Sequence, residues 1–186
     1  MLQHSYRRWS ARSRGFTLVE LAVTLAVMGI IAVIAVPSFN NLIRSNRLTS
    51  SANEMVALLQ TARSAAISNR ASAVVCPSTD GSTCAAAAGS RWIARQTKAG
   101  VTTVLRDSAL AQGITASTSS NLSGASNQLT FTPAGFSRAG TNSSGSIGVC
   151  STQLPGNNSI VVTAAVGRIS TARRAATAAC TAPPNT

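Results

Sequence analysis

The stretch "GFTLVELAVTLAVMGIIAVIAVPSF", residues 15–39, decides the architecture of this 186-residue chain. Residues 16–36 are apolar apart from Thr17, Glu20 and Thr24. As a helix that rises 1.5 Å per residue, they would be roughly 31 Å long, which is about the thickness of one hydrocarbon core. The sequence therefore predicts one membrane-spanning helix over residues 16–37.

The residues before this helix predict its orientation. Residues 1–15 contain four arginines and no acid. Basic flanks stay in the cytoplasm, so everything after Pro37 is expected across the membrane. A secretory signal carries its small-residue cleavage site after the apolar stretch, whereas Gly15 precedes it here. Cleavage after Gly15 would leave the helix on the mature protein, and an uncleaved signal anchor is the alternative.

Glu20 is the exception within the apolar stretch. A charge costs roughly 2.5–3.5 kcal/mol near the centre of a membrane helix and less toward an end. A residue retained at that cost indicates a function and requires a cationic partner.

The whole stretch "RGFTLVELAVTLAVMGIIAVIAVPSF" resembles the N-terminus of type IV pilins and type II secretion pseudopilins. The resemblance implies cleavage after Gly15 by a prepilin peptidase and N-methylation of Phe16. It also implies that Glu20 pairs with the N-terminal amine of a neighbouring subunit during filament assembly. The expected location is the inner membrane, with one span and a periplasmic C-terminal domain, and then a pilus or pseudopilus fibre.

The remainder of the chain predicts an α+β domain. Pro37 removes one helical hydrogen bond and predicts a kink, after which apolar residues at helical spacing continue the helix to about residue 72. Seven short β-rich runs follow, separated by polar breaks, and predict antiparallel sheet packed on the helix. The expected organisation is a leader at 1–15, a transmembrane assembly helix at 16–37 and a pilin-like globular domain at 38–186.

Four cysteines in a compartment beyond the membrane are expected to form disulfides. Three connectivities are possible. The turn within "CPSTDGSTC" favours Cys76–Cys84, which leaves Cys150–Cys180. A metal site is the weaker alternative, because no CxxC spacing occurs.

Four further segments resemble the GspH/FimT family of minor pilins and pseudopilins: "CPSTDGSTC", "SRWIA", "LTFTPAGFS" and "VVTAAVGRIS". FimT-type members are implicated in DNA uptake through a C-terminal glycine-arginine-any-arginine motif. Gly167 and Arg168 match its first two positions, with Gly167 expected to allow the hairpin turn before Arg168. Ser170 stands in place of the last arginine, and Arg173 and Arg174 restore the charge.

The charge balance agrees with a polyanionic partner. Sixteen basic residues face four acids, and no acid follows Asp107. Arginine pairs with phosphate through two hydrogen bonds. No aromatic residue lies between Val166 and Arg174, so the sequence predicts contact with the phosphate backbone of DNA without base stacking.

The resulting prediction is a minor type IV pilin that binds DNA for uptake in natural transformation. The alternative is the H-type minor pseudopilin of a type II secretion system, a structural part of protein export. In a third interpretation the arginines contact pilin neighbours or lipid headgroups. The scattered acids and single histidine build no catalytic group, so we expect no enzyme activity, cofactor, metal or small-molecule substrate.

Overall fold

The computed structural model describes residues 15–177 and 179–185, so the rest of the predicted leader, residues 1–14, lies outside the described residues. Helix α1 spans Leu18–Asn69. Thr17 caps its first turn, because the Thr17 hydroxyl accepts a hydrogen bond of 3.2 Å from the Glu20 backbone N–H. Pro37 lies inside α1 and does not end it. The kink at Pro37 stays a prediction.

The chain divides into two compact units, Met1–Asn40 and Asn41–Thr186. Every described residue of the first unit is exposed. Its apolar window, with a mean hydropathy of 2.6, is long and apolar enough to cross a membrane. Buried hydrophobic residues begin at Leu48, so the second unit contains the whole described core and both disulfides. A fragment from Asn41 onward is therefore expected to fold by itself.

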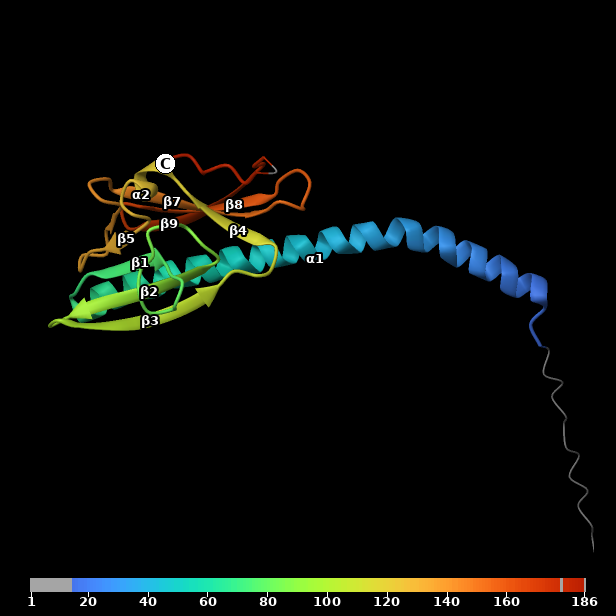
Figure 1. Cartoon of the computed structure of the whole chain (residues 1–186), viewed down its shortest axis with the longest axis horizontal. Coiled ribbons are helices and arrows are strands. Elements are labelled where there is room, and N and C mark those ends of the chain that lie inside the picture. Colours follow the sequence, from blue (N-terminus) through green and yellow to red (C-terminus); the bar gives the residue numbers. More distant parts are fainter. Residues whose placement is uncertain (1–14, 178, 186) are drawn as a thin grey trace, which may run out of the picture. The chain divides into compact units, whose positions relative to one another are not determined.

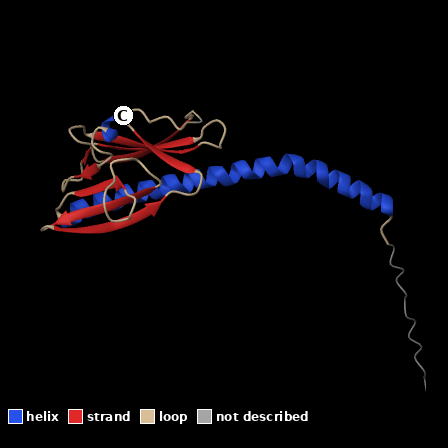
Figure 2. Ribbon diagram, in the orientation of Figure 1, coloured by secondary structure: helices blue, strands red, loops and turns tan. Residues whose placement is uncertain are grey.

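Two antiparallel sheets make up most of the second unit (Figures 1 and 2). The first has the order β3-β2-β1-β5-β6, from strands β1 (Ala73–Pro77), β2 (Arg91–Lys98), β3 (Val101–Ala109), β5 (Leu129–Phe131) and β6 (Ser137–Arg138). The second has the order β4-β7-β8-β9, from strands β4 (Ile114–Thr118), β7 (Ser144–Ser151), β8 (Ser159–Ala165) and β9 (Arg168–Arg174). A short helix α2 (Ser120–Ser123) precedes β5. The α+β class with antiparallel sheet is confirmed.

Both sheets share one hydrophobic core with α1. The helix buries a stripe of residues at helical spacing: Leu48, Ser51, Ala52, Met55, Leu58, Leu59, Ala62 and Ala66. The sheets contribute large side chains to the same core, including the fully buried Trp92 and Phe131. The stripe confirms that α1 continues as a core helix.

Helix α1 ends at Asn69, three residues before the predicted end. Arg70 follows in the left-handed conformation (φ 51°), which stops the helix. The buried Gln96 of β2 stabilises this end. Its amide donates to the carbonyls of Ala65 (3.1 Å) and Ala71 (2.7 Å) and accepts from the Asn69 side chain (2.7 Å). These bonds attach the end of α1 to the first sheet.

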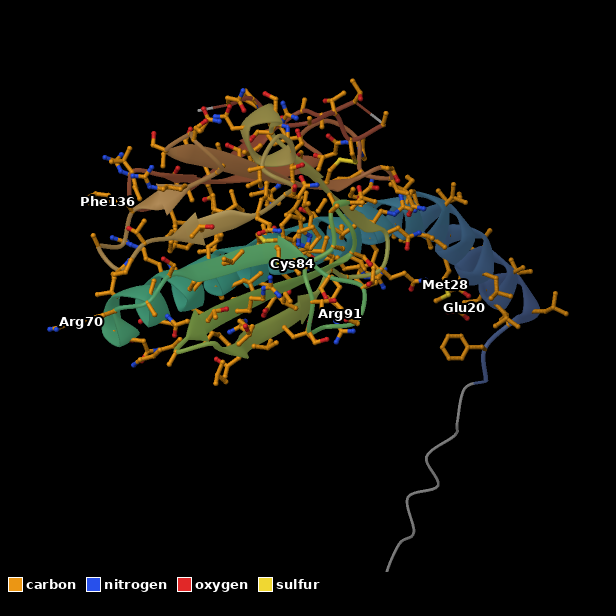
Figure 3. The ribbon with its side chains drawn as sticks, turned by 60° about the vertical axis from the view of Figure 1, so that its left-hand side comes forward. Glu20, Met28, Arg70, Cys84, Arg91 and Phe136 are labelled. Atoms are coloured by element: carbon orange, nitrogen blue, oxygen red, sulfur yellow. A yellow bond between two sulfur atoms is a disulfide. The ribbon has the colours of Figure 1, made fainter. Side chains whose placement is uncertain are left out.

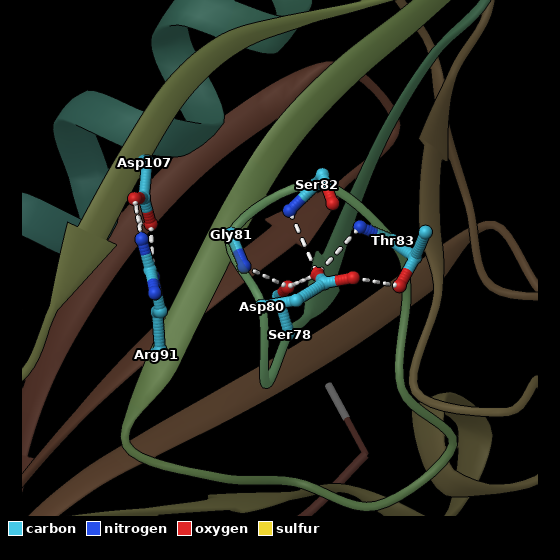
Figure 4. A network of polar contacts seen from close by, with 7 residues as sticks. All are labelled: Ser78, Asp80, Gly81, Ser82, Thr83, Arg91 and Asp107. Atoms are coloured by element: carbon cyan, nitrogen blue, oxygen red, sulfur yellow. Dashed lines mark hydrogen bonds and ion pairs between the residues drawn. The ribbon is translucent and has the colours of Figure 1, made fainter.

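The structure joins Cys76 to Cys84 and Cys150 to Cys180, the same pairs that the sequence favours. The first disulfide closes a loop organised by Asp80 (Figure 4). The Asp80 carboxylate accepts hydrogen bonds from the Thr83 hydroxyl (2.6 Å) and from the backbone N–H groups of Thr83 and Ser82 (2.8 Å each). These donors, the Thr83 hydroxyl first, hold the pKa of the Asp80 carboxyl well below its usual range.

One segment, residues 117–127, has the small polar composition that is typical of a loop. It contains the end of β4 and the whole of α2. Strand β4 pairs with β7 from Ile114 to Thr118, and Ser119, fully buried, donates its backbone N–H to the Ser146 carbonyl at 2.9 Å. The polar, serine-rich composition did not indicate this strand, although β7 satisfies its backbone hydrogen bonds.

We expect Asp80→Asn to destabilise the globular unit at neutral pH. A carboxyl whose pKa is lower in the folded than in the unfolded state stabilises the fold above its unfolded pKa of about 3.9. This contribution is lost as pH falls toward the folded value. The difference in unfolding temperature between wild type and Asp80→Asn should be constant from about pH 5 to 8 and shrink below about pH 4.

Thr79→Ala is the matched control in the same exposed loop and should leave the unfolding temperature unchanged at each pH. A wild-type advantage over Asp80→Asn that grows on acidification would contradict this account.

Candidate functional site

The β8–β9 hairpin presents the predicted Gly167-Arg168 motif. Strand β8 ends at Ala165, β9 begins at Arg168, and these two residues pair across a two-residue turn. Val166 (φ 47°) and Gly167 (φ 76°) both adopt the left-handed conformation, as a type I′ hairpin turn requires. The expectation that Gly167 allows the turn therefore agrees with its backbone. Val166 is strained, because a β-branched residue rarely adopts a positive φ.

Gly167 also allows a close approach between two loops. A Cβ at this position would lie 3.0 Å from the Gly135 carbonyl oxygen and 3.5 Å from an Arg63 guanidinium nitrogen. Gly135 is the glycine of the "FTPAG" element, and its carbonyl accepts a hydrogen bond of 3.2 Å from Arg63 Nε. The two short motifs, more than thirty residues apart in sequence, meet at Arg63 on α1.

Gly135 packs on the end of α1 in the same way. Its φ is 82°, and a Cβ there would lie 2.9 Å from Ile67 Cδ1. The loop that contains it is fixed by backbone hydrogen bonds from Gly135 N–H to the Thr132 carbonyl (2.8 Å) and from Thr132 N–H to the Phe136 carbonyl (2.9 Å). Both motif loops therefore rest on the last turns of α1.

The three predicted DNA-binding arginines do not converge. Arg168 and Arg173 are five residues apart on β9, which is about 17 Å along a strand, and side chains an odd number apart point to opposite faces. Arg173 donates to the Thr49 hydroxyl of α1 at 2.7 Å. Arg174 donates to the carbonyls of Thr181 (2.5 Å) and Ala182 (2.8 Å) in the C-terminal tail.

Arg168 differs from the other two. It is exposed at the start of an edge strand, and within the described part of the chain its guanidinium donates no hydrogen bond. It lines a shallow surface hollow with Thr163, Ala165, Val166 and Ser170. Arg168 is thus the arginine of the motif that is available to a ligand.

Two further arginines lie close to this position, and sequence reasoning missed them. Arg138 of β6 is exposed and lines a second hollow, which shares Val166 with the first. Arg63 reaches the same turn from α1. We call Arg63, Arg138 and Arg168 the arginine corner. No sequence signal unites them, because they come from three elements that only the fold brings together.

The carboxylates of Asp107 and Glu54 pair with arginines that are not part of the corner. Arg91 pairs with Asp107 (Figure 4), and Arg106 pairs with Glu54 at 2.6 Å. The Arg91 guanidinium holds the pKa of the Asp107 carboxyl below its usual range. Both pairs involve arginines of the first sheet, and no acid is among the residues that line the two hollows of the corner.

The C-terminal tail crosses the outer face of the second sheet. Cys180 is bonded to Cys150 of β7, and the buried Pro183 ring lies where a Cβ on Gly148 would meet it at 3.3 Å. Asn185 donates to the Ser120 hydroxyl at 2.6 Å and accepts from the Asn121 backbone at 3.0 Å. The Arg174 side chain donates its hydrogen bonds to this tail.

Among the described residues, no group of three or more metal-ligating side chains comes together.

Comparison with known proteins identifies the family of this chain. Residues 51–167, more than half of the chain, match the family described as type II transport protein GspH. The chain belongs to the GspH family. Residues 10–36 match the prokaryotic N-terminal methylation motif. This GspH-family protein therefore combines a pilin-like N-terminus with a minor-pilin or pseudopilin globular domain, as the resemblance implied.

Individual relatives match this GspH-family chain mainly over short segments. It is 53% identical over 32 residues to the type IV major pilin protein PilA of Myxococcus xanthus, covering 17% of this chain and 14% of that protein. It is 35% identical over 57 residues to a fimbrial protein of Pseudomonas aeruginosa, covering 31% and 37%. The chain thus spans well under half of either relative.

Among solved structures, the type IV minor pilin FimU of Pseudomonas aeruginosa is similar, with 26% identity and a TM-score of 0.49. The match covers 68% of this chain and 88% of that chain.

Substitutions at the two turn positions should have opposite effects on stability. Gly167→Ala places a side chain in the left-handed conformation and against the Gly135 carbonyl, so we expect a loss of about 1–2 kcal/mol. Val166→Asn replaces a strained residue with one that favours this turn, so a gain of up to about 1 kcal/mol is expected. Urea unfolding of the fragment from Asn41 measures both. A stabilising Gly167→Ala would show that the turn is wrongly described.

Proposed function

We propose that this protein is a minor type IV pilin that inserts into a pilus and binds DNA for uptake in natural transformation. The arginine corner carries the DNA-binding part of this proposal. Arg168 is exposed and free of intramolecular partners in the described structure, and Arg63 and Arg138 add positive charge beside it. Exposed guanidinium groups without nearby acids suit phosphate oxygens.

The N-terminus supports the filament part of the proposal. The methylation motif covers Gly15, Phe16 and Glu20. We propose that a prepilin peptidase cleaves after Gly15, that Phe16 is N-methylated, and that the domain after Pro37 is periplasmic before assembly. The new α-amine of a neighbouring subunit would then be the cation that a membrane-buried Glu20 needs.

The proposed binding is electrostatic and independent of sequence. Each phosphate contact adds about −0.9 to the slope of log affinity against log salt concentration on duplex DNA. Three contacts at the corner would give a slope of about −2.7. One subunit would bind weakly, and several DNA-binding subunits in one filament would bind more tightly by avidity.

Two observations favour a second function. The matching family is described as type II transport protein GspH, and Ser170 occupies the position of the second motif arginine. The protein would then be a structural H-type pseudopilin in protein export. Deletion in the source bacterium separates the two: the pilin proposal expects loss of transformation with secretion intact, and the pseudopilin alternative expects the reverse.

Arg168→Ala tests the DNA contact directly. We expect weaker duplex binding by the fragment from Asn41 and a salt slope smaller in magnitude by about 1. Arg47→Ala removes the same charge from an exposed position on α1 and is the matched control, with a much smaller effect. Duplex binding by Arg173→Ala and by Arg174→Ala, measured separately, tests the other two arginines that the sequence predicts to contact DNA.

Gel retardation over a salt series provides the readout. Absence of retardation at low salt would remove DNA binding by the isolated subunit. Equal losses in Arg168→Ala and Arg47→Ala would mean that the corner is not the site.

Glu20 variants test the assembly role. Glu20 lies at the third helical position after its cap, Thr17, where either glutamate or glutamine can support the helix start. If pairing with an α-amine is the function, Glu20→Gln and Glu20→Ala should both prevent incorporation into filaments, because both remove the charge. The measurement is the amount of this subunit in sheared pili by immunoblot. Normal incorporation of Glu20→Gln would indicate a capping role instead.

A further inference from the structure

Phe136 is the exposed aromatic residue of the globular unit. Of the three aromatic side chains that the structure describes after Asn41, Trp92 and Phe131 are fully buried, whereas Phe136 is 52% exposed. Figure 3 shows Phe136 at the outer margin of the domain. An exposed phenyl ring leaves apolar surface in water, and a ligand with a flat apolar face would cover that surface.

Hydrogen bonds hold the backbone at Phe136 in a turn. The Thr132 hydroxyl accepts from the Phe136 N–H at 3.3 Å, and the Phe136 carbonyl accepts from the Thr132 N–H. The preceding Gly135 is fixed from α1 by Arg63 and by packing on Ile67. The ring therefore stands on a preorganised turn, which lowers the entropy cost of binding.

One arginine shares the hollow of this ring, and a second lines the hollow next to it. Phe136 and Arg138 line one hollow together with Val166, and Arg168 lines a second hollow that shares Val166 with the first. Thr132, Ser137 and Ser143 complete the lining of the first hollow. The surface thus combines one aromatic face and two exposed arginines, with no carboxylate among the lining residues.

This combination distinguishes between forms of DNA. Duplex DNA offers phosphates to arginine but keeps its bases stacked inside. Single-stranded DNA offers phosphates and free base faces, and an aromatic residue next to basic residues is the usual way in which proteins bind it. We propose that the surface formed by Phe136, Arg138 and Arg168 prefers single-stranded DNA, with one base stacked on Phe136 and the flanking phosphates on the two arginines.

This inference rests on the proposed DNA-binding function and deepens it by naming the form of the ligand. Stacking of one base on an aromatic side chain raises affinity by roughly tenfold or more. The preference should therefore be visible in a single subunit. It is independent of base identity, because every base has a flat face.

Fluorescence anisotropy of labelled oligonucleotides tests the proposal with the fragment from Asn41. The probes are a short oligothymidine, an abasic strand of the same length and a blunt duplex, all at one salt concentration. The abasic strand retains the phosphates and lacks the bases, so it isolates stacking from charge. Wild type should bind oligothymidine about tenfold more tightly than the abasic strand.

Three variants assign the contributions. Phe136→Leu should abolish the difference between oligothymidine and the abasic strand and leave duplex binding unchanged, whereas Phe136→Trp should preserve the difference. Arg138→Ala should weaken binding of the oligothymidine and abasic strands equally and reduce the salt slope on single strands by about 0.7. Unchanged thermal unfolding of Phe136→Leu checks that the exposed ring is not needed for folding.

The outcomes separate the two hypotheses. Absence of binding to all three probes removes the proposed DNA-binding function. Duplex binding with equal affinity for oligothymidine and the abasic strand leaves DNA binding in place and overturns the single-strand preference. If Phe136→Leu instead binds all probes normally but fails to enter pili, the surface is a contact between subunits and the inference is wrong.

Discussion

The fold depends on the burial of one stripe of α1 against two β-sheets at the same time. The helix contributes small side chains to this core, such as Ala52, Ala62 and Ala66, alongside leucines. The sheets contribute the largest side chains, Trp92 and Phe131. Burying each large apolar side chain is worth about 1.5–3 kcal/mol. Neither sheet has another described helix of comparable length to cover it, so both depend on α1 for a closed core.

Close approaches of the backbone position the candidate site on that core. Gly135 and Gly167 each sit where a Cβ would strike a neighbour, and both have positive φ. The fold alone therefore explains why the two short motifs have glycine at these positions, without reference to a ligand. Arg168 has no such reason within the described structure, because its side chain is exposed and its guanidinium donates no hydrogen bond there. This contrast explains the two glycines by folding and leaves Arg168 as the motif residue that is open to a ligand.

The sequence predicted the helix, seven of the strands and the pairing of the cysteines from local patterns. It missed β4 and β6, because "ITAST" is rich in small polar residues and β6 has only two residues. It also grouped Arg168, Arg173 and Arg174 by proximity along the chain. The alternation of side chains along a strand already places Arg168 and Arg173 on opposite faces. Arg63 and Arg138 could not be added, because their proximity to Arg168 depends on how α1, β6 and β9 pack together.

The disulfide between Cys150 and Cys180 has a mechanical consequence. The thirty residue steps between these cysteines include β8, β9 and the turn with Arg168. Fully stretched, that length of chain would extend by about 100 Å. Because the disulfide closes this segment into a covalent ring, a force that pulls on the subunit cannot lengthen it by this amount. Tension can distort the β8–β9 hairpin, but it cannot draw the hairpin out into an extended strand.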